Sequence, residues 1–175
     1  MAYLGNTTLE DTVDTANIKD GAVTDVKLAS GIVPTKTAFR ATNTSSQTAN
    51  GSGATVINFQ SAGANKGSDF DTANSRYVCP ADGYYFFTAD ISVEGGDGND
   101  DTMYLGIYEN GSLRAEVRDN WRYQTGSGRE YTTTVSAVVG CDAGDYIDLR
   151  YRGISTSITI VNGDCTFNGF LLFED

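Results

Sequence analysis

Apolar and polar residues alternate in short runs along most of the chain after residue 37. In the run 102–109, Tyr104 and Tyr108 fall on one side of an extended backbone, whereas Leu105 and Ile107 fall on the other. No run after residue 37 has both the length and the 3.6-residue period of an amphipathic helix. The period of two predicts ten strands, at residues 37–42, 54–60, 75–79, 83–93, 102–109, 112–121, 130–139, 145–152, 156–162 and 165–173.

Glycine-rich clusters separate these runs and predict tight turns. The steps Asn110-Gly111 and Asn162-Gly163 are hairpin signals, because both residue types tolerate a positive φ. The chain holds twenty Gly, ten Tyr and eight Phe but only two Pro, a composition that suits short strands joined by turns. The sequence therefore predicts an all-β fold, a jelly-roll sandwich.

The first 36 residues lack this strand pattern and divide into two segments. Residues 1–16 are predicted to be an extended arm that either stays disordered or docks on a partner, because the arm alone cannot bury its few apolar side chains. Residues 17–36 are predicted to be a neck or linker, which is too short to be stable in isolation. Residues 37–175 are predicted to form the jelly-roll domain. The apolar positions are Tyr3, Leu4, Leu9 and Val13 in the arm, and Ile18, Val23, Val26, Leu28 and Ile32 in the neck.

The charge of the chain excludes several classes of partner. A net charge of −11 repels phosphate backbones and anionic membranes, so we expect no nucleic-acid partner. It also serves solubility. We expect no membrane insertion, because no stretch approaches the roughly 20 apolar residues of a span. The first residues lack a basic, apolar leader, so we expect no signal peptide and synthesis in a cytoplasm.

Catalysis is not expected. The chain has no His, which rules out a Ser–His–Asp arrangement and removes the commonest general base. A glycosidase needs two carboxylates at a fixed separation in a cleft, and among so many acidic residues no pair stands out. The sequence therefore predicts a protein that is not an enzyme.

Three cysteines, Cys79, Cys141 and Cys165, are too few for a disulfide framework. Cysteine packs as a small apolar residue, so three buried thiols are the first expectation. One bridge with one free thiol is the alternative.

Two segments carry candidate binding chemistry. The acidic segment Glu94–Asp101 has four carboxylates in eight residues, Glu94, Asp97, Asp100 and Asp101, and predicts either a calcium site or a solvated acidic loop. No other cofactor is expected. The segment Arg118–Tyr131 predicts either a sugar or acidic-ligand site or a contact between subunits. Its candidate residues are Arg118, Trp121, Arg122, Tyr123, Arg129 and Tyr131.

Several motifs resemble the globular domain of complement component 1q. In Tyr77–Phe87 an aromatic residue is followed after five residues by Gly-x-Tyr-x-Phe, and the resemblance continues in "MYLGIYENGS", "VVGCDAGDYIDLR" and "CTFNGFLLFED". The resemblance covers residues 37–175. It implies a ten-stranded jelly roll, similar to tumour necrosis factor, that assembles as a homotrimer. Its core or trimer-contact residues would be Tyr77, Gly83, Tyr85, Phe87, Phe167, Gly169 and Leu171.

The stretch "IKDGAVTDVKLASG" resembles short repeats in bacteriophage tail-fibre and virion appendage proteins, a resemblance that covers about residues 1–36. It implies a virion structural protein: a short trimeric appendage whose arm binds other virion proteins and whose domain binds a host receptor or glycan. In a trimer, three necks could bury their apolar residues against one another. Two alternatives are a head or neck decoration protein and a cellular complement-type binding module.

Overall fold

The computed structural model describes residues 37–49, 53–95, 100–122, 130–153 and 158–175. These residues form thirteen strands and the turns between them. The strands are β1 (Ala38–Thr42), β2 (Gln47–Ala49), β3 (Thr55–Val56), β4 (Ser61–Lys66), β5 (Phe70–Asp71), β6 (Arg76–Val78), β7 (Gly83–Gly95), β8 (Asp100–Glu109), β9 (Ser112–Arg122), β10 (Glu130–Cys141), β11 (Tyr146–Gly153), β12 (Ile158–Ile160) and β13 (Thr166–Glu174). No described helix is long and apolar enough to span a membrane.

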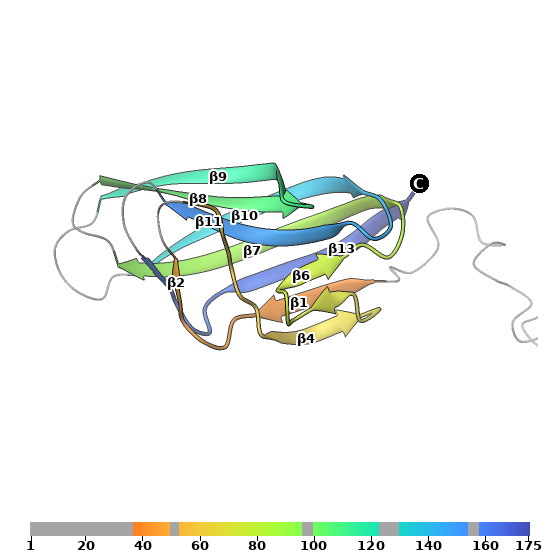
Figure 1. Ribbon diagram of the computed structural model, residues 1–175, viewed down its shortest axis with the longest axis horizontal. Helices are drawn as coiled ribbons and strands as arrows, with labels where there is room; N and C mark the ends of the chain where they lie inside the picture. The colour runs from red at the N-terminus through yellow and green to blue at the C-terminus, as the bar shows by residue number, and fades with distance from the viewer. Residues whose placement is uncertain (1–36, 50–52, 96–99, 123–129, 154–157) are drawn as a thin grey trace, which may run out of the picture. The chain divides into compact units, whose positions relative to one another are not determined.

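The strands form two antiparallel sheets packed face to face (Figure 1). Sheet A has the order β2-β12-β7-β13-β1-β4, and β10 pairs with the other edge of β7. Sheet B has the order β5-β6-β11-β8-β9, and β3 pairs with β11. The last strand, β13, is central in sheet A, between β7 and β1. The predicted jelly-roll sandwich is confirmed.

Each predicted run contains a strand, but the structure adds β2, β4 and β5. The segment 61–69 is one of the glycine-rich clusters between predicted runs, where a turn was expected, and this expectation is wrong because β4 occupies most of the segment. Its Ala, Gly and Asn residues have weak strand propensity. The ladder to β1 holds them extended instead, with an irregular register opposite Arg40 and Ala41. Such a bulge blunts an edge strand against further pairing.

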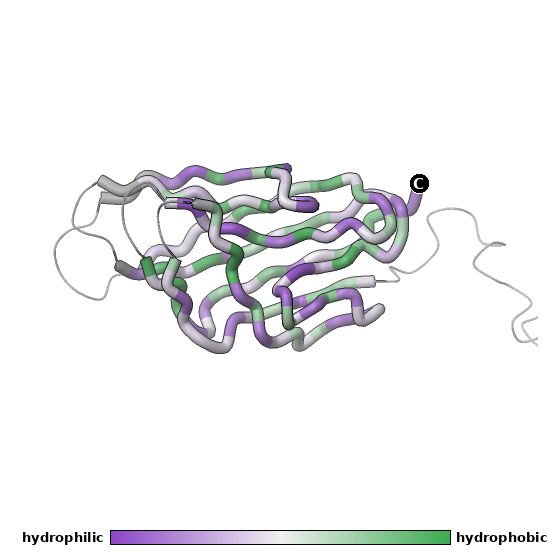
Figure 2. The backbone as a smooth tube through the Cα atoms, in the orientation of Figure 1, coloured by the Kyte–Doolittle hydropathy of each residue, from purple (hydrophilic) through white to green (hydrophobic). Residues whose placement is uncertain are grey.

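The core lies between the sheets and is rich in aromatic rings. Phe39 is its centre: its ring centroid lies 4.8 Å from those of Phe70 and Tyr77 and 4.9 Å from that of Phe167. Alternate residues of the long strands supply the other core side chains, and Figure 2 shows this alternation along the backbone. The period of two is therefore the direct cause of the two-layer packing.

Two glycines are required where β13 meets its neighbours. A Cβ at Gly169 would lie 2.5 Å from Cδ1 of Phe87 and 2.7 Å from Cε1 of Phe39. A Cβ at Gly83, where φ is +156°, would lie 2.4 Å from the carbonyl oxygen of Phe173. Both positions therefore exclude any side chain, Gly169 because of packed rings and Gly83 because of backbone.

A polar network of hydrogen bonds connects Thr37, the first described residue, to sheet B. The Thr37 hydroxyl lies 2.5 Å from a carboxylate oxygen of Asp69 and 2.7 Å from the hydroxyl of Tyr77. Because Thr37 has one hydroxyl hydrogen, Tyr77 donates to Thr37 and Thr37 donates to Asp69. Burial raises the pKa of Tyr77 well above its usual value, so this donor stays protonated.

The three cysteines are buried free thiols. A thiol–thiol hydrogen bond to Cys141 and burial raise the pKa of Cys79. Burial raises the pKa of Cys165 to about 11. Both thiols are therefore protonated at neutral pH, which makes them poor nucleophiles.

Candidate interaction surface

The outer face of sheet A carries an unusual concentration of exposed apolar side chains. Tyr84 is 41%, Phe170 39%, Phe173 56% and Val138 58% exposed. Together with the half-buried Phe86 they form the surface we call the aromatic face. Single exposed apolar residues are ordinary, whereas a contiguous group of this kind marks a contact surface.

The strand register brings the aromatic face together from three strands. Phe86 of β7 lies opposite both Val138 of β10 and Phe170 of β13. Two residues away on β7, Tyr84 lies opposite Phe173, and their rings stack with centroids 4.9 Å apart. The rings of Phe86 and Phe170 lie 5.6 Å apart. The five side chains are therefore neighbours on one face of the sheet.

The other half of this outer face is polar. Asp90 of β7 accepts a hydrogen bond from the Thr134 hydroxyl at 2.5 Å and one from the Thr166 hydroxyl at 3.5 Å. Nearby, the hydroxyls of Ser92 and Thr132 lie 2.8 Å apart. The outer face of sheet A thus changes from apolar to hydrogen-bonded along β7, which confines an apolar contact to the Tyr84 end.

The residues predicted to form the core or the trimer contact are all buried in the interior of one copy of the domain. Gly83 and Gly169 are buried beneath neighbouring backbone and rings. The five others are at most 6% exposed: Tyr77, Tyr85, Phe87, Phe167 and Leu171. They build the core of the sandwich, and the exposed aromatic face is made by the residues that alternate with them.

The outer face of sheet B has a different character, in which arginines cover tyrosine rings. The guanidinium carbon of Arg152 lies 3.9 Å from the ring centroid of Tyr104, and that of Arg118 lies 5.6 Å from it. Arg150 lies over Tyr108 at 4.8 Å. These cation–π contacts fix the guanidinium groups on an open, polar sheet face.

The predicted ligand residues do not share one described surface. Arg118 is exposed on sheet B, whereas Tyr131 of β10 is half-buried and packs against the core. The backbones of Trp121 and Arg122 end β9 opposite Asp101 and Asp100. Their side chains, together with Tyr123 and Arg129, lie outside the described residues. The sequence pattern missed Tyr104 and Arg152, which cross-strand pairing places beside Arg118.

The predicted calcium residues are described only in part. Glu94 is half-buried at the end of β7, opposite Glu130 of β10. Asp97 and the side chains of Asp100 and Asp101 lie outside the described residues. Among the described residues, no group of three or more metal-binding side chains comes together. The arm and neck residues, all within 1–36, also lie outside the described part.

A buried carboxylate stands at the hairpin that joins β8 to β9. Glu109 is 5% exposed and accepts a hydrogen bond from Nε of Arg114. Burial raises the pKa of Glu109, the nearby Asp145 carboxyl raises it further, and Arg114 opposes both effects. Asn110 donates to Asp145 at 2.6 Å and, as the largest cause, lowers the pKa of that carboxyl.

We expect Glu109→Gln to change how stability depends on pH. A carboxyl whose pKa is raised on folding favours the folded state below its unfolded pKa of about 4.5 and loses this contribution as the pH rises. The variant lacks that loss, so its stability relative to the wild type should increase between pH 4 and pH 7. Urea unfolding at both pH values measures the difference, and a difference that does not change with pH would contradict the assignment.

Comparison with known proteins places this sandwich in a family. The C1q domain matches residues 38–172. The globular domain of zebrafish complement 1qA protein aligns with a TM-score of 0.54 and 17% identity, covering 80% of this chain and 100% of the other. Eiger TNF from S. frugiperda aligns with a TM-score of 0.61 and 9% identity, covering 81% of this chain and 96% of the other.

The fold is therefore the jelly roll of C1q and TNF-like proteins, a class of trimeric, non-enzymatic binding modules. The chain belongs to the C1q domain family.

Proposed function

We propose that this chain is a homotrimeric binding module in which the aromatic face is the contact between copies. The observation that carries the proposal is the exposure of Tyr84, Val138, Phe170 and Phe173 on one face of an otherwise acidic, soluble domain. Burial of this face would remove a large apolar area from water, which would stabilise the assembly by about 25 cal/mol for each Å² buried. The family forms homotrimers, so a second and third copy are the natural occupants of the face.

We further propose that the module serves as a short bacteriophage virion appendage. Its support is the pattern of residues 17–33, whose apolar side chains need trimer mates for burial. Residues 1–16 would then anchor the trimer to other virion proteins, residues 17–36 would form its neck, and the domain would bind a host receptor or glycan. A decoration protein of the head or neck would share the first two roles and lack the third.

Deletion of residues 1–16 tests the anchor. The shortened chain is expected to remain a soluble trimer, because the proposed contact lies within the domain, and to be absent from assembled particles. The measurement is the amount of the protein in purified particles, compared with the full chain expressed at the same level. Normal incorporation of the shortened chain would reject the anchor and leave the domain assembly untouched.

A cellular complement-type module remains the alternative, and the same experiment separates it from the virion role. Such a module has no particle to join, so its full chain would also be absent from particles. Loss of host-cell binding by Trp121→Ala in an intact trimer would favour receptor binding over decoration.

A further inference from the structure

The outer face of sheet B concentrates positive charge in a chain of net charge −11. Four of its arginines each lie over a tyrosine ring: Arg76, Arg118, Arg150 and Arg152. The register places them on one face, because Arg118 and Arg152 both lie opposite Tyr104, whereas Asp148 lies opposite both Arg76 and Tyr108.

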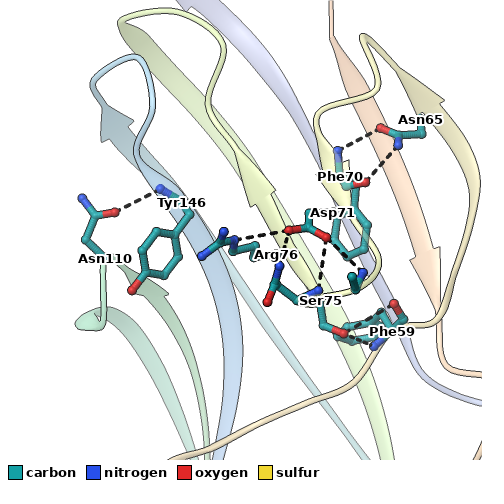
Figure 3. A network of polar contacts seen from close by, with 10 residues as sticks. Phe59, Asn65, Phe70, Asp71, Ser75, Arg76, Asn110 and Tyr146 are labelled. Carbon is teal, nitrogen blue, oxygen red and sulfur yellow. Dashed lines mark hydrogen bonds and ion pairs between the residues drawn. The ribbon is translucent and has the colours of Figure 1, made fainter.

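One of these arginines is already neutralised by a carboxylate, and a second lies near one. Arg150 donates to the two carboxylate oxygens of Asp148 at 2.7 and 2.8 Å, which is a bidentate pair on a buried aspartate. Arg76 lies 3.6 Å from Asp71 and covers the ring of Tyr146, as Figure 3 shows. The Arg150 guanidinium is therefore not available to a ligand without breaking a contact within the chain, whereas Arg76 is only loosely paired and stands on β6, away from Tyr104.

The other two arginines flank Tyr104 and keep donors available. Nη2 of Arg152 donates to both carboxylate oxygens of Glu116 at 3.3 and 3.4 Å, and the Arg152 side chain is 43% exposed, so this long, solvent-exposed ion pair is weak. Arg118 is exposed, and no carboxylate of the described residues pairs with it. We call Tyr104, Glu116, Arg118 and Arg152 the Tyr104 cluster. It carries two guanidinium groups against one carboxylate.

Stacking prepares the cluster for a carboxylate ligand. A guanidinium that lies over a ring is held in place without using all of its N–H donors, and two neighbouring donors match a carboxylate in a bidentate fashion. Arg118 and Arg152 stand on strands β9 and β11, with β8 between them. Two strand spacings separate their backbones by about 10 Å, so the cluster offers two carboxylate positions across an open face.

We propose that the Tyr104 cluster binds carboxylate groups of an acidic polysaccharide. This deepens the proposed binding role by naming its ligand class. Salt confines the attraction of the cluster to about 8 Å, and the rest of the domain is acidic. A densely charged nucleic acid would extend beyond the cluster and be repelled. A sugar polymer with separated carboxylates places charge only where the guanidinium groups are, and its hydroxyls suit the Tyr and Glu groups beside them.

The test measures binding of the full-length protein, at 150 mM salt, to immobilised hyaluronate, a sugar polymer that carries a carboxylate on every second sugar. Arg118→Ala and Arg152→Ala should each weaken binding about tenfold, the effect of losing one charge-assisted contact. Arg118→Lys should lose part of the affinity, because it keeps the charge but not the planar fork. Arg76→Ala is the matched control: it removes an arginine from the same sheet face, on β6 away from the cluster, and its carboxylate neighbour Asp71 is 31% exposed, so no buried carboxylate is left unpaired and the variant should bind as the wild type does.

Several results would overturn the proposal. They are no binding by the wild type, unchanged binding by Arg118→Ala, an equal loss in Arg76→Ala, and tighter binding to duplex DNA than to hyaluronate. Thermal melting of each variant excludes unfolding as the cause of a loss. Light scattering on the same samples separates this inference from the assembly: a trimer that does not bind rejects the ligand class alone, whereas a monomer rejects the proposed assembly.

Discussion

Gly169→Val is expected to destabilise the domain by about 3 kcal/mol, the upper end of the usual cost of overpacking and a large part of the 5–15 kcal/mol typical of a domain. The new side chain would have to occupy space held by the rings of Phe87 and Phe39, 2.5 and 2.7 Å from its Cβ. Phe39 cannot yield, because Phe70, Tyr77 and Phe167 surround it. Urea unfolding followed by tryptophan fluorescence measures the loss.

Gly63→Val is the control for this experiment. Gly63 lies on the edge strand β4, where a Cβ would meet nothing within 4 Å, and its φ is not positive. The same chemical change should therefore alter stability by no more than about 0.5 kcal/mol. Equal stability of Gly169→Val and the wild type would show that the rings can move aside, which contradicts the packing described for β13.

Val138→Asp is expected to dissociate the trimer without unfolding the chain. Val138 is 58% exposed in the single chain, so the aspartate stays in water as long as the chain is alone. In the trimer it would enter an apolar contact, and burial of an unpaired carboxylate costs several kcal/mol. Sedimentation analysis should show a monomer at concentrations where the wild type is a trimer, with a circular dichroism spectrum like that of the wild type.

Leu113→Asp is the matched control for the assembly. Leu113 is 47% exposed and also apolar, but it belongs to β9 of sheet B, away from the aromatic face. This variant should therefore keep the mass of the wild type. If Leu113→Asp dissociates the protein and Val138→Asp does not, the contact between copies lies on the other sheet.

The sequence was sufficient for the sandwich because most strands have a clear alternation. The run from Gly83 to Val93 places Tyr85 and Phe87 in the core, as a period of two requires. It was insufficient for β4, whose small residues become a strand only through the ladder to β1. The segment becomes a strand because it pairs with β1, which is distant in the sequence, and the local residue pattern carries no information about that pairing.

The interaction surfaces were harder to predict, although one signal was available. The stretch 84–87 is aromatic at every position, so both faces of β7 are apolar and both must be covered. That pattern points to the aromatic face. The Tyr104 cluster has no such local signal, because Arg118 and Arg152 are 34 positions apart in the chain and meet only through the register of β8 with β9 and β11.

The central claim is that this domain assembles as a trimer through the outer face of sheet A. The most direct measurement is the solution mass of the full chain by light scattering at low concentration, beside a chain that starts at Thr35. We expect a mass of three chains for both proteins, because the aromatic face lies wholly within the domain. A monomer in both would contradict it.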